Sequence, residues 1–451
     1  MNNLLKSVTE RAIKYQQGLD SRSVAPSNEA LEQLVELDVP LQDESIADEE
    51  IIALLDRVGS PATVATSGGR YFGFVIGGSL PAAQAATLLV DVWDQNACLR
   101  VMSPISIALE EIALRWLLDV LALPHECGAS FVTGASMANF TGLAAARHAV
   151  LARAGWDVEA KGLYGAPEIT VVVGEEVHAT VIKALGLLGF GRKRVVTVPT
   201  DEQGRMRVDV LPSLSATTII CIQAGNVNTG AFDPAQEICA AAHRAGAWVH
   251  VDGAFGLWAA AAPDRAYLMK GFADADSWAT DGHKWLNVPY DSGIAFVRNP
   301  DHLRAAMAFT AEYLPQAYKR EPLDFTPEAS RRARGVAVWA ALRALGRKGV
   351  ADLVERTCTY AARFADGLKA AGYKVLNDVL LNQVLVSFGD DVMTRKVIAA
   401  IQADGTCWCG ETVWHGQVLM RISVSSWATT ETDVERSLNA MVRLAHEQAA
   451  L

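Results

Sequence analysis

The pattern of hydrophobic and polar positions changes character along the chain. Residues 1–60 predict helices joined by loops, and residues 104–121 predict an amphipathic helix. From about residue 130, short β-branched runs alternate with helical segments, which is typical of a largely parallel sheet covered by helices. The predicted strands span residues 169–173, 195–198, 217–222, 248–251, 276–280 and 293–297. A sheet of this kind binds its ligands beyond the carboxyl ends of its strands.

The last third of the chain has a different pattern. Helices are predicted over residues 334–347 and 353–371, and they are followed by strands and helices in a smaller α+β arrangement. We therefore expect an α/β protein in three parts: a helical segment over 1–80, a large α/β domain over 81–330 and a small α+β domain over 331–451. Residues 309–332 form a long irregular connection, and such connections are often functional loops.

Composition narrows the class of protein. The chain has 451 residues, 51% of them hydrophobic, and a net charge of −11, which disfavours nucleic acid as a partner. Its first twenty residues lack the apolar core of a secretory signal, and no apolar stretch is long enough to span a bilayer. Seven scattered cysteines indicate free thiols in a reducing compartment and no metal site. We expect a cytoplasmic protein without a membrane partner.

Lys284 has an unusual position for a lysine. It lies in a short turn between the predicted strands 276–280 and 293–297, beside His283 and Trp285. A partly desolvated lysine becomes a usable amine nucleophile, so one interpretation is a lysine that forms a Schiff base. The other interpretation is a lysine that closes a turn. The local sequence does not decide between them.

Three further groups bear on Lys284. Ser136 begins a helix in a run of small residues, where free N–H groups favour an anion such as phosphate. Asp252 ends a strand and is able to hold a proton on a heteroaromatic nitrogen, and His178 follows a strand at the same edge, where it is able to stack on a flat cofactor. Each has an ordinary structural interpretation. Together, and in this order, the four groups fit pyridoxal 5′-phosphate (PLP).

The chain resembles the group II PLP-dependent decarboxylases, the family of aromatic amino acid, glutamate and tyrosine decarboxylases. The likeness is most specific in the sequence Asp-Gly-His-Lys-Trp-Leu over residues 281–286, where His-Lys-Trp is a hallmark. It continues in four further segments, residues 134–139 (GASMAN), 225–233 (GNVNTGAFD), 251–256 (VDGAFG) and 331–334 (RRAR).

The resemblance implies a fold type I enzyme with a mostly parallel seven-stranded sheet, and a homodimer with its active site near the interface. It also implies a role for each matching residue. Lys284 forms the Schiff base with PLP, and Asp252 pairs with the pyridine nitrogen. The remaining implied contacts are His178 and Ala254 on the two ring faces, Ala135, Ser136 and His283 at the phosphate, and Asn226 near the cofactor. The proton is returned by the loop acid Tyr313 (or Tyr318), with His178 as the alternative catalytic donor.

The expected reaction is decarboxylation of an L-amino acid to the amine and CO2. Tyr71, Phe72 and Phe74 favour an aromatic or apolar substrate if they line the pocket, and Arg70 or Arg100 would suit an acidic one. The alternatives are another PLP lyase, an aldehyde synthase or an aminotransferase on the same fold. A non-catalytic PLP-binding protein is the alternative from a different class.

Overall fold

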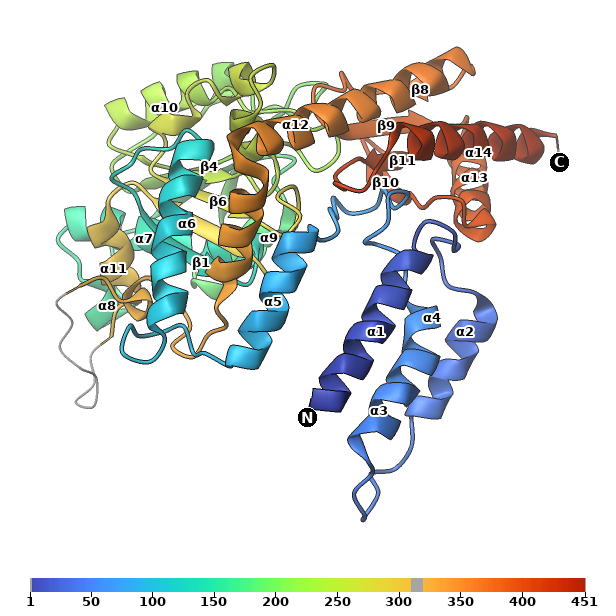
Figure 1. The fold of residues 1–451 in the computed structure, drawn as a ribbon. Helices are drawn as coiled ribbons and strands as arrows, with labels where there is room; N and C mark the ends of the chain where they lie inside the picture. Colours follow the sequence, from blue (N-terminus) through green and yellow to red (C-terminus); the bar gives the residue numbers. More distant parts are fainter. Residues whose placement is uncertain (1, 310–318, 451) are drawn as a thin grey trace.

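The computed structural model describes residues 2–309 and 319–450, and it contains two β-sheets (Figure 1). The larger sheet has seven strands in the order β1-β7-β6-β5-β4-β2-β3, with β7 antiparallel to both of its neighbours. Its strands are β1 (Gly128–Val132), β2 (Thr170–Gly174), β3 (Val195–Val198), β4 (Thr218–Gln223), β5 (Trp248–Asp252), β6 (Ser277–Asp281) and β7 (Gly293–Val297). The predicted α/β class is confirmed, and the predicted strands agree with the observed ones to within one residue.

Both faces of the large sheet are covered, which explains why its strands are apolar at successive positions. In β2, Val171 and Val173 belong to one hydrophobic cluster and Val172 to another, because neighbouring side chains point to opposite faces. The helices of this part are α5 (Pro81–Trp93), α6 (Pro104–Val120), α7 (Ala135–Arg153), α8 (Val158–Lys161), α9 (Ala179–Leu187), α10 (Ala235–Arg244) and α11 (Pro300–Met307).

The smaller sheet has four antiparallel strands in the order β10-β11-β9-β8. They are β8 (Lys374–Val375), β9 (Gln383–Ser387), β10 (Gly410–Trp414) and β11 (Gln417–Ser423), and they pack with α13 (Asp391–Asp404) and α14 (Glu431–Ala449). The long helix α12 (Arg334–Ala370) runs from the large sheet to the small one (Figure 1). Gly346 has non-helical backbone angles and kinks α12 into two helical parts. The sequence predicted two helices, over residues 334–347 and 353–371.

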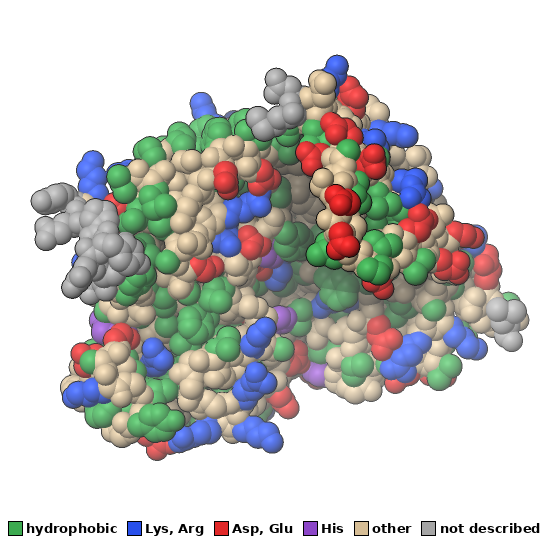
Figure 2. All heavy atoms as spheres, turned by 90° about the horizontal axis from the view of Figure 1, so that it is seen from below, with side chains coloured by type: hydrophobic (Ala, Val, Ile, Leu, Met, Phe, Trp, Pro, Cys, Tyr) green, Lys and Arg blue, Asp and Glu red, His purple; other side chains and the backbone are tan. Residues whose placement is uncertain are grey.

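The N-terminal helices form an arm that extends away from the body (Figure 1). They are α1 (Asn2–Gly18), α2 (Asn28–Glu32), α3 (Asp48–Leu54) and α4 (Ser60–Ala62). Few of their side chains are buried, and Figure 2 shows a hollow between the arm and the rest of the molecule. No helix within the two described ranges is long and apolar enough to cross a membrane. The division of the chain at residues 80 and 330 stays a prediction.

The segment after the arm joins the small sheet. Phe72 N donates to the Trp408 carbonyl at 2.8 Å, and Ser423 N donates to the Phe72 carbonyl at 2.9 Å. The Phe72 ring is fully buried against Phe364 in the core of the small sheet. Tyr71 is also buried and stacks on Trp408. The expectation that Tyr71 and Phe72 line a substrate pocket is therefore wrong, because both rings fill the hydrophobic interior and neither borders the cavity described below.

Candidate active site

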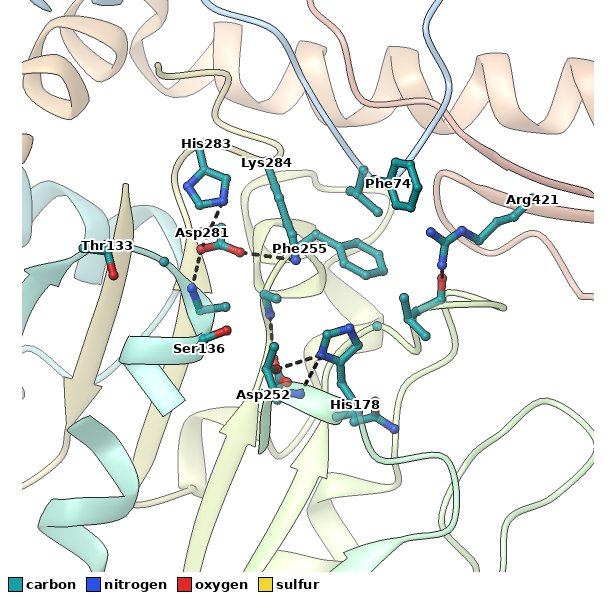
Figure 3. A pocket seen from close by; sticks show the side chains of 18 residues that line it. Phe74, Thr133, Ser136, His178, Asp252, Phe255, Asp281, His283, Lys284 and Arg421 are labelled. Atoms are coloured by element: carbon teal, nitrogen blue, oxygen red, sulfur yellow. Dashed lines mark hydrogen bonds and ion pairs between the residues drawn. The ribbon is translucent and has the colours of Figure 1, made fainter. Parts of the chain in front are cut away.

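A cavity of about 350 Å³ lies at the carboxyl ends of the central strands (Figure 3). The last residues of three neighbouring strands line it: Gln223 of β4, Asp252 of β5 and Asp281 of β6. The register of the parallel strands places Asp252 beside Gln223 on one side and Ala279 on the other. The topology thus gathers side chains from distant parts of the chain, as expected for the edge of an open α/β sheet.

Lys284 enters this cavity from the connection between β6 and β7 (Figure 3). Its Nζ lies 3.2 Å from Asp281 Oδ2. The other oxygen of that carboxylate, Oδ1, accepts a hydrogen bond from the backbone N–H of Ala135 at 2.6 Å and lies 3.6 Å from His283 Nε2. The nearly buried Asp281 therefore contacts three groups that the sequence assigned to the cofactor, although it had no assigned role itself. Its position at the end of a strand, three residues before Lys284, was the available signal.

The N-terminus of α7 forms another wall of the cavity. Gly134 precedes the helix and packs so closely on β7 that a Cβ on Gly293 would lie 2.4 Å from the Gly134 backbone. Thr133, Ala135 and Ser136 all line the cavity, and the Ser136 side chain is exposed to it. The positive end of a helix dipole with a hydroxyl beside it fits the phosphate of PLP.

Asp252 is held by an ordered chain of hydrogen bonds. Its Oδ1 accepts from the Ala254 N–H at 3.2 Å, and its Oδ2 accepts from Asn139 Nδ2 at 3.2 Å. Asn139 Oδ1 accepts from His250 Nε2 at 2.9 Å, and His250 Nδ1 accepts from the Ser277 hydroxyl at 2.8 Å. His250 had been assigned an ordinary structural role, and its ring lies fully buried behind the site. The chain fixes the direction of the Asp252 carboxylate, which fits a partner for a protonated ring nitrogen.

The two histidines of the cavity are neutral donors. Burial lowers the pKa of both His178 and His283. His178 Nδ1 accepts from the Thr180 N–H at 3.3 Å, and His283 Nδ1 accepts from the Ser292 N–H at 3.1 Å. Because a backbone N–H only donates, each neutral ring carries its proton on Nε2.

Other assigned residues divide into those at the cavity and those away from it. Ala254 and Phe74 line it. Asn226 does not: its amide nitrogen donates to Glu176 Oε2 at 2.9 Å and its oxygen caps the following turn. The expected contact of Asn226 with the cofactor is therefore replaced by a role in holding its own loop. Tyr313 and Tyr318 lie outside the described residues.

A second basic group of the cavity, beside Lys284, is Arg421 of β11, which the sequence interpretation missed. Its Nη1 donates to the Val227 carbonyl at 2.9 Å, and burial lowers its pKa. Within residues 2–309 and 319–450, no carboxylate lies within ion-pair distance of it. Arg70 and Arg100, the expected candidates, are elsewhere: Arg70 is buried among backbone carbonyls, and Arg100 pairs with Glu111.

The amine of Lys284, the anion cradle of α7, the fixed carboxylate of Asp252 and the imidazole of His178 surround one cavity. This set is the donor arrangement of a PLP-dependent enzyme of fold type I, and the residues present fit the cofactor. The comparison with known proteins identifies which enzyme family uses it.

Residues 32–388 match the family model described as the pyridoxal-dependent decarboxylase conserved domain. The aromatic-L-amino-acid decarboxylase of Bacillus atrophaeus is 27% identical over 347 residues, which is 72% of this chain and 70% of the relative. The L-2,4-diaminobutyrate decarboxylase of Rhizobium meliloti is 28% identical over 400 residues, 82% of this chain and 76% of the relative. The crystal structure of Oryza sativa TDC with PLP and tryptamine has the same fold, with a TM-score of 0.90, 22% identity and coverage of 99% and 97% of the two chains.

The chain belongs to the pyridoxal-dependent decarboxylase family. It is a PLP-dependent amino acid carboxy-lyase, as the resemblance implied. The identity of the amino acid depends on the cavity itself, since the relatives are named for substrates with different side chains.

Proposed function

We propose that the protein decarboxylates an L-amino acid with an aromatic or apolar side chain, and that Arg421 binds the substrate carboxylate. The supporting observation is a half-buried, partly desolvated guanidinium that borders the cavity without an acidic partner among the described residues. A desolvated cation favours an anionic ligand, and a guanidinium matches a carboxylate in geometry. Phe74, Val75 and Val227 provide the apolar lining beside it, which favours an uncharged side chain.

Each remaining group has one task in this proposal. PLP, when bound, supplies an aldehyde that condenses with amines and a ring that accepts the electrons left by departing CO2. Lys284 provides the amine that holds the cofactor and is displaced by the substrate amine. Asp252 keeps the proton on the ring nitrogen, and His178, which lines the same cavity, provides the flat ring that stacks on the cofactor.

The proton returned to the substrate carbon is assigned to Tyr313, on the resemblance alone. Replacing it with Phe is expected to slow amine formation or to divert product to the aldehyde, because the hydroxyl is the proton source. Amine, aldehyde and CO2 are measured together. Unchanged amine formation would remove Tyr313 from the mechanism, and Tyr318→Phe would then be tested in the same way.

A homodimer is part of the proposal. Helix α5, the loop after it and the start of α6 expose an apolar surface that consists of Leu88, Leu89, Val92, Trp93, Val101, Met102 and Ile105. The arm adds exposed side chains such as Leu5, Ile13 and Leu31, and it buries little against its own chain. A surface of this kind supports association with a second copy.

Light scattering after size exclusion should give the mass of a dimer, and Val92→Glu should shift the protein toward the monomer. A monomeric wild-type protein would refute it.

The substrate is tested by incubating the purified protein and PLP with each amino acid in turn, with CO2 and amine as readouts. We expect turnover of aromatic or apolar amino acids. Arg421→Met should reduce kcat/KM by about 10–100-fold, since a charged hydrogen bond contributes about 1.5–3 kcal/mol. The matched control is Arg395→Met, because Arg395 is exposed on α13 and pairs with Glu411 away from the cavity. Turnover restricted to acidic amino acids would instead assign Arg421 to the substrate side chain.

A further inference from the structure

Asp281 places a carboxylate at the same helix N-terminus that fits the cofactor phosphate. Its Oδ1 is 2.6 Å from the Ala135 N–H that opens α7. Its side chain is only 3% exposed, so water screens the charge poorly. Figure 3 shows the carboxylate between Lys284, His283 and the first turn of α7.

The surroundings of Asp281 hold the carboxylate in place from behind. The indole Nε1 of Trp258 donates to the Asp281 carbonyl at 3.1 Å, and the Asp281 N–H donates to the Ala254 carbonyl at 2.9 Å. The residue is the last of β6, and the whole strand is buried. Because its backbone is fixed on both sides, the side chain has little room to leave the helix N-terminus.

The charges at this point do not balance once a phosphate is present. A phosphate brings up to two negative charges to the N–H groups of α7, where Asp281 already contributes one. The basic group beside the carboxylate is Lys284, whose Nζ lies 3.2 Å from Oδ2, and this nitrogen forms the Schiff base when PLP is bound. Burial lowers the pKa of His283 and thus disfavours a second cation beside the carboxylate.

We propose that Asp281 weakens cofactor retention through charge, and so keeps PLP exchangeable in this enzyme. The carboxylate opposes the phosphate at the cradle, and it also holds Lys284 Nζ at 3.2 Å, which is the nitrogen that must leave the carboxylate to condense with an aldehyde. An amide at this position would keep the hydrogen bond from Ala135 and remove both effects. Asp281 is therefore a positioning residue that sets the affinity of the site for its own cofactor.

The test is Asp281→Asn, in which the side-chain shape is preserved. Tryptophan fluorescence is the readout, since Trp258 contacts Asp281 directly. Three compounds separate the two effects: PLP, pyridoxine 5′-phosphate, which has the phosphate without the aldehyde, and pyridoxal, which has the aldehyde without the phosphate. We expect the Kd for pyridoxine 5′-phosphate to fall by about tenfold, the Kd for pyridoxal to fall by less, and the Kd for PLP to fall by at least tenfold.

The control is Asp276→Asn, because Asp276 precedes the opposite end of β6 and its removal changes the net charge equally. It should leave all three Kd values unchanged. An unchanged or higher Kd for pyridoxine 5′-phosphate in Asp281→Asn would overturn the proposal. Equal changes in both aspartate variants would also overturn it, because they would show a general charge effect. The measurement requires no turnover, so it is independent of the assigned substrate.

Discussion

Replacing Asn139 with Leu interrupts the hydrogen-bond chain behind Asp252 at its central link. The side chain is fully buried in α7 and connects His250 to the carboxylate. Leu has a similar volume and no polar atoms, so the change removes hydrogen bonds with little change in packing. Two consequences follow, one for stability and one for the cofactor.

The stability effect comes from His250. Its Nε2–H loses its acceptor in a site that water does not reach, and an unsatisfied buried donor costs about 1–3 kcal/mol. The cofactor effect comes from Asp252, which keeps the Ala254 N–H and loses the other donor. A hydrogen bond to a charged group contributes about 1.5–3 kcal/mol, so PLP binding should weaken by about 10–100-fold if the carboxylate turns away.

Urea unfolding gives the first effect, and titration with PLP followed by tryptophan fluorescence gives the second. Thr141→Val is the matched control, because Thr141 is buried on the same helix and its hydroxyl bonds only to the Met137 carbonyl. The control should lose stability without losing PLP affinity. If Asn139→Leu binds PLP with the same affinity as the wild type, the hydrogen-bond chain through Asn139 stabilises the fold and does not orient Asp252.

Three further predictions follow from other parts of the structure. Lys284→Ala should leave no visible absorbance from cofactor bound through a Schiff base; a band that persists would remove Lys284 from its role. Burial lowers the pKa of His250 from 6.5 to about 4, so the free energy of unfolding decreases as the pH falls through this interval. Burial raises the pKa of Asp233 from 3.8 to about 6, so this group increases the free energy of unfolding as the pH falls through its own interval. Asp233→Asn should therefore steepen the loss of stability between about pH 6.5 and pH 4 in urea unfolding, and an unchanged slope would contradict these shifts. Arg331→Met should cost about 3–5 kcal/mol, because it removes the nearer cation of the buried Glu110 and leaves Arg320, 3.7 Å from Oε1, as its ion-pair partner. Adding Glu110→Leu should restore part of the loss in calorimetry; no recovery would show that packing, and not charge, sets the cost.

The sequence was informative where local pattern and topology act together. The β-branched runs predicted the strands because both sheet faces are buried, and the strand ends then predicted where Asp252 and Lys284 would meet. Phe72 shows the limit of this reasoning. An aromatic run is equally suited to a pocket and to a core, and only the pairing of residue 72 with Trp408 and Ser423 of the distant small sheet decides the matter.

The structure places Asn226 away from the cavity for a local reason. Its loop begins at the cavity, but Glu176 accepts a hydrogen bond from the Asn226 amide and turns it away. The same carboxylate accepts from Trp414 Nε1 and from His415 Nε2, at the hairpin between β10 and β11. Glu176 therefore joins the large sheet to the small one. No motif reports such a contact, because its members are more than two hundred residues apart.

That junction explains why the cofactor was predictable and the substrate was not. The groups that fit PLP come from the ends of β2, β5 and β6 in the large sheet and from the start of α7, which packs on that sheet. The sequence predicts these elements. Arg421 comes from β11 of the other sheet, and it reaches the cavity beside Val227 only because the two sheets are held together. The cofactor site therefore depends on the large sheet, whereas substrate binding by Arg421, as proposed above, would depend on the contact between the two sheets. Substitutions at Glu176 should accordingly affect KM for the amino acid more than the Kd for PLP.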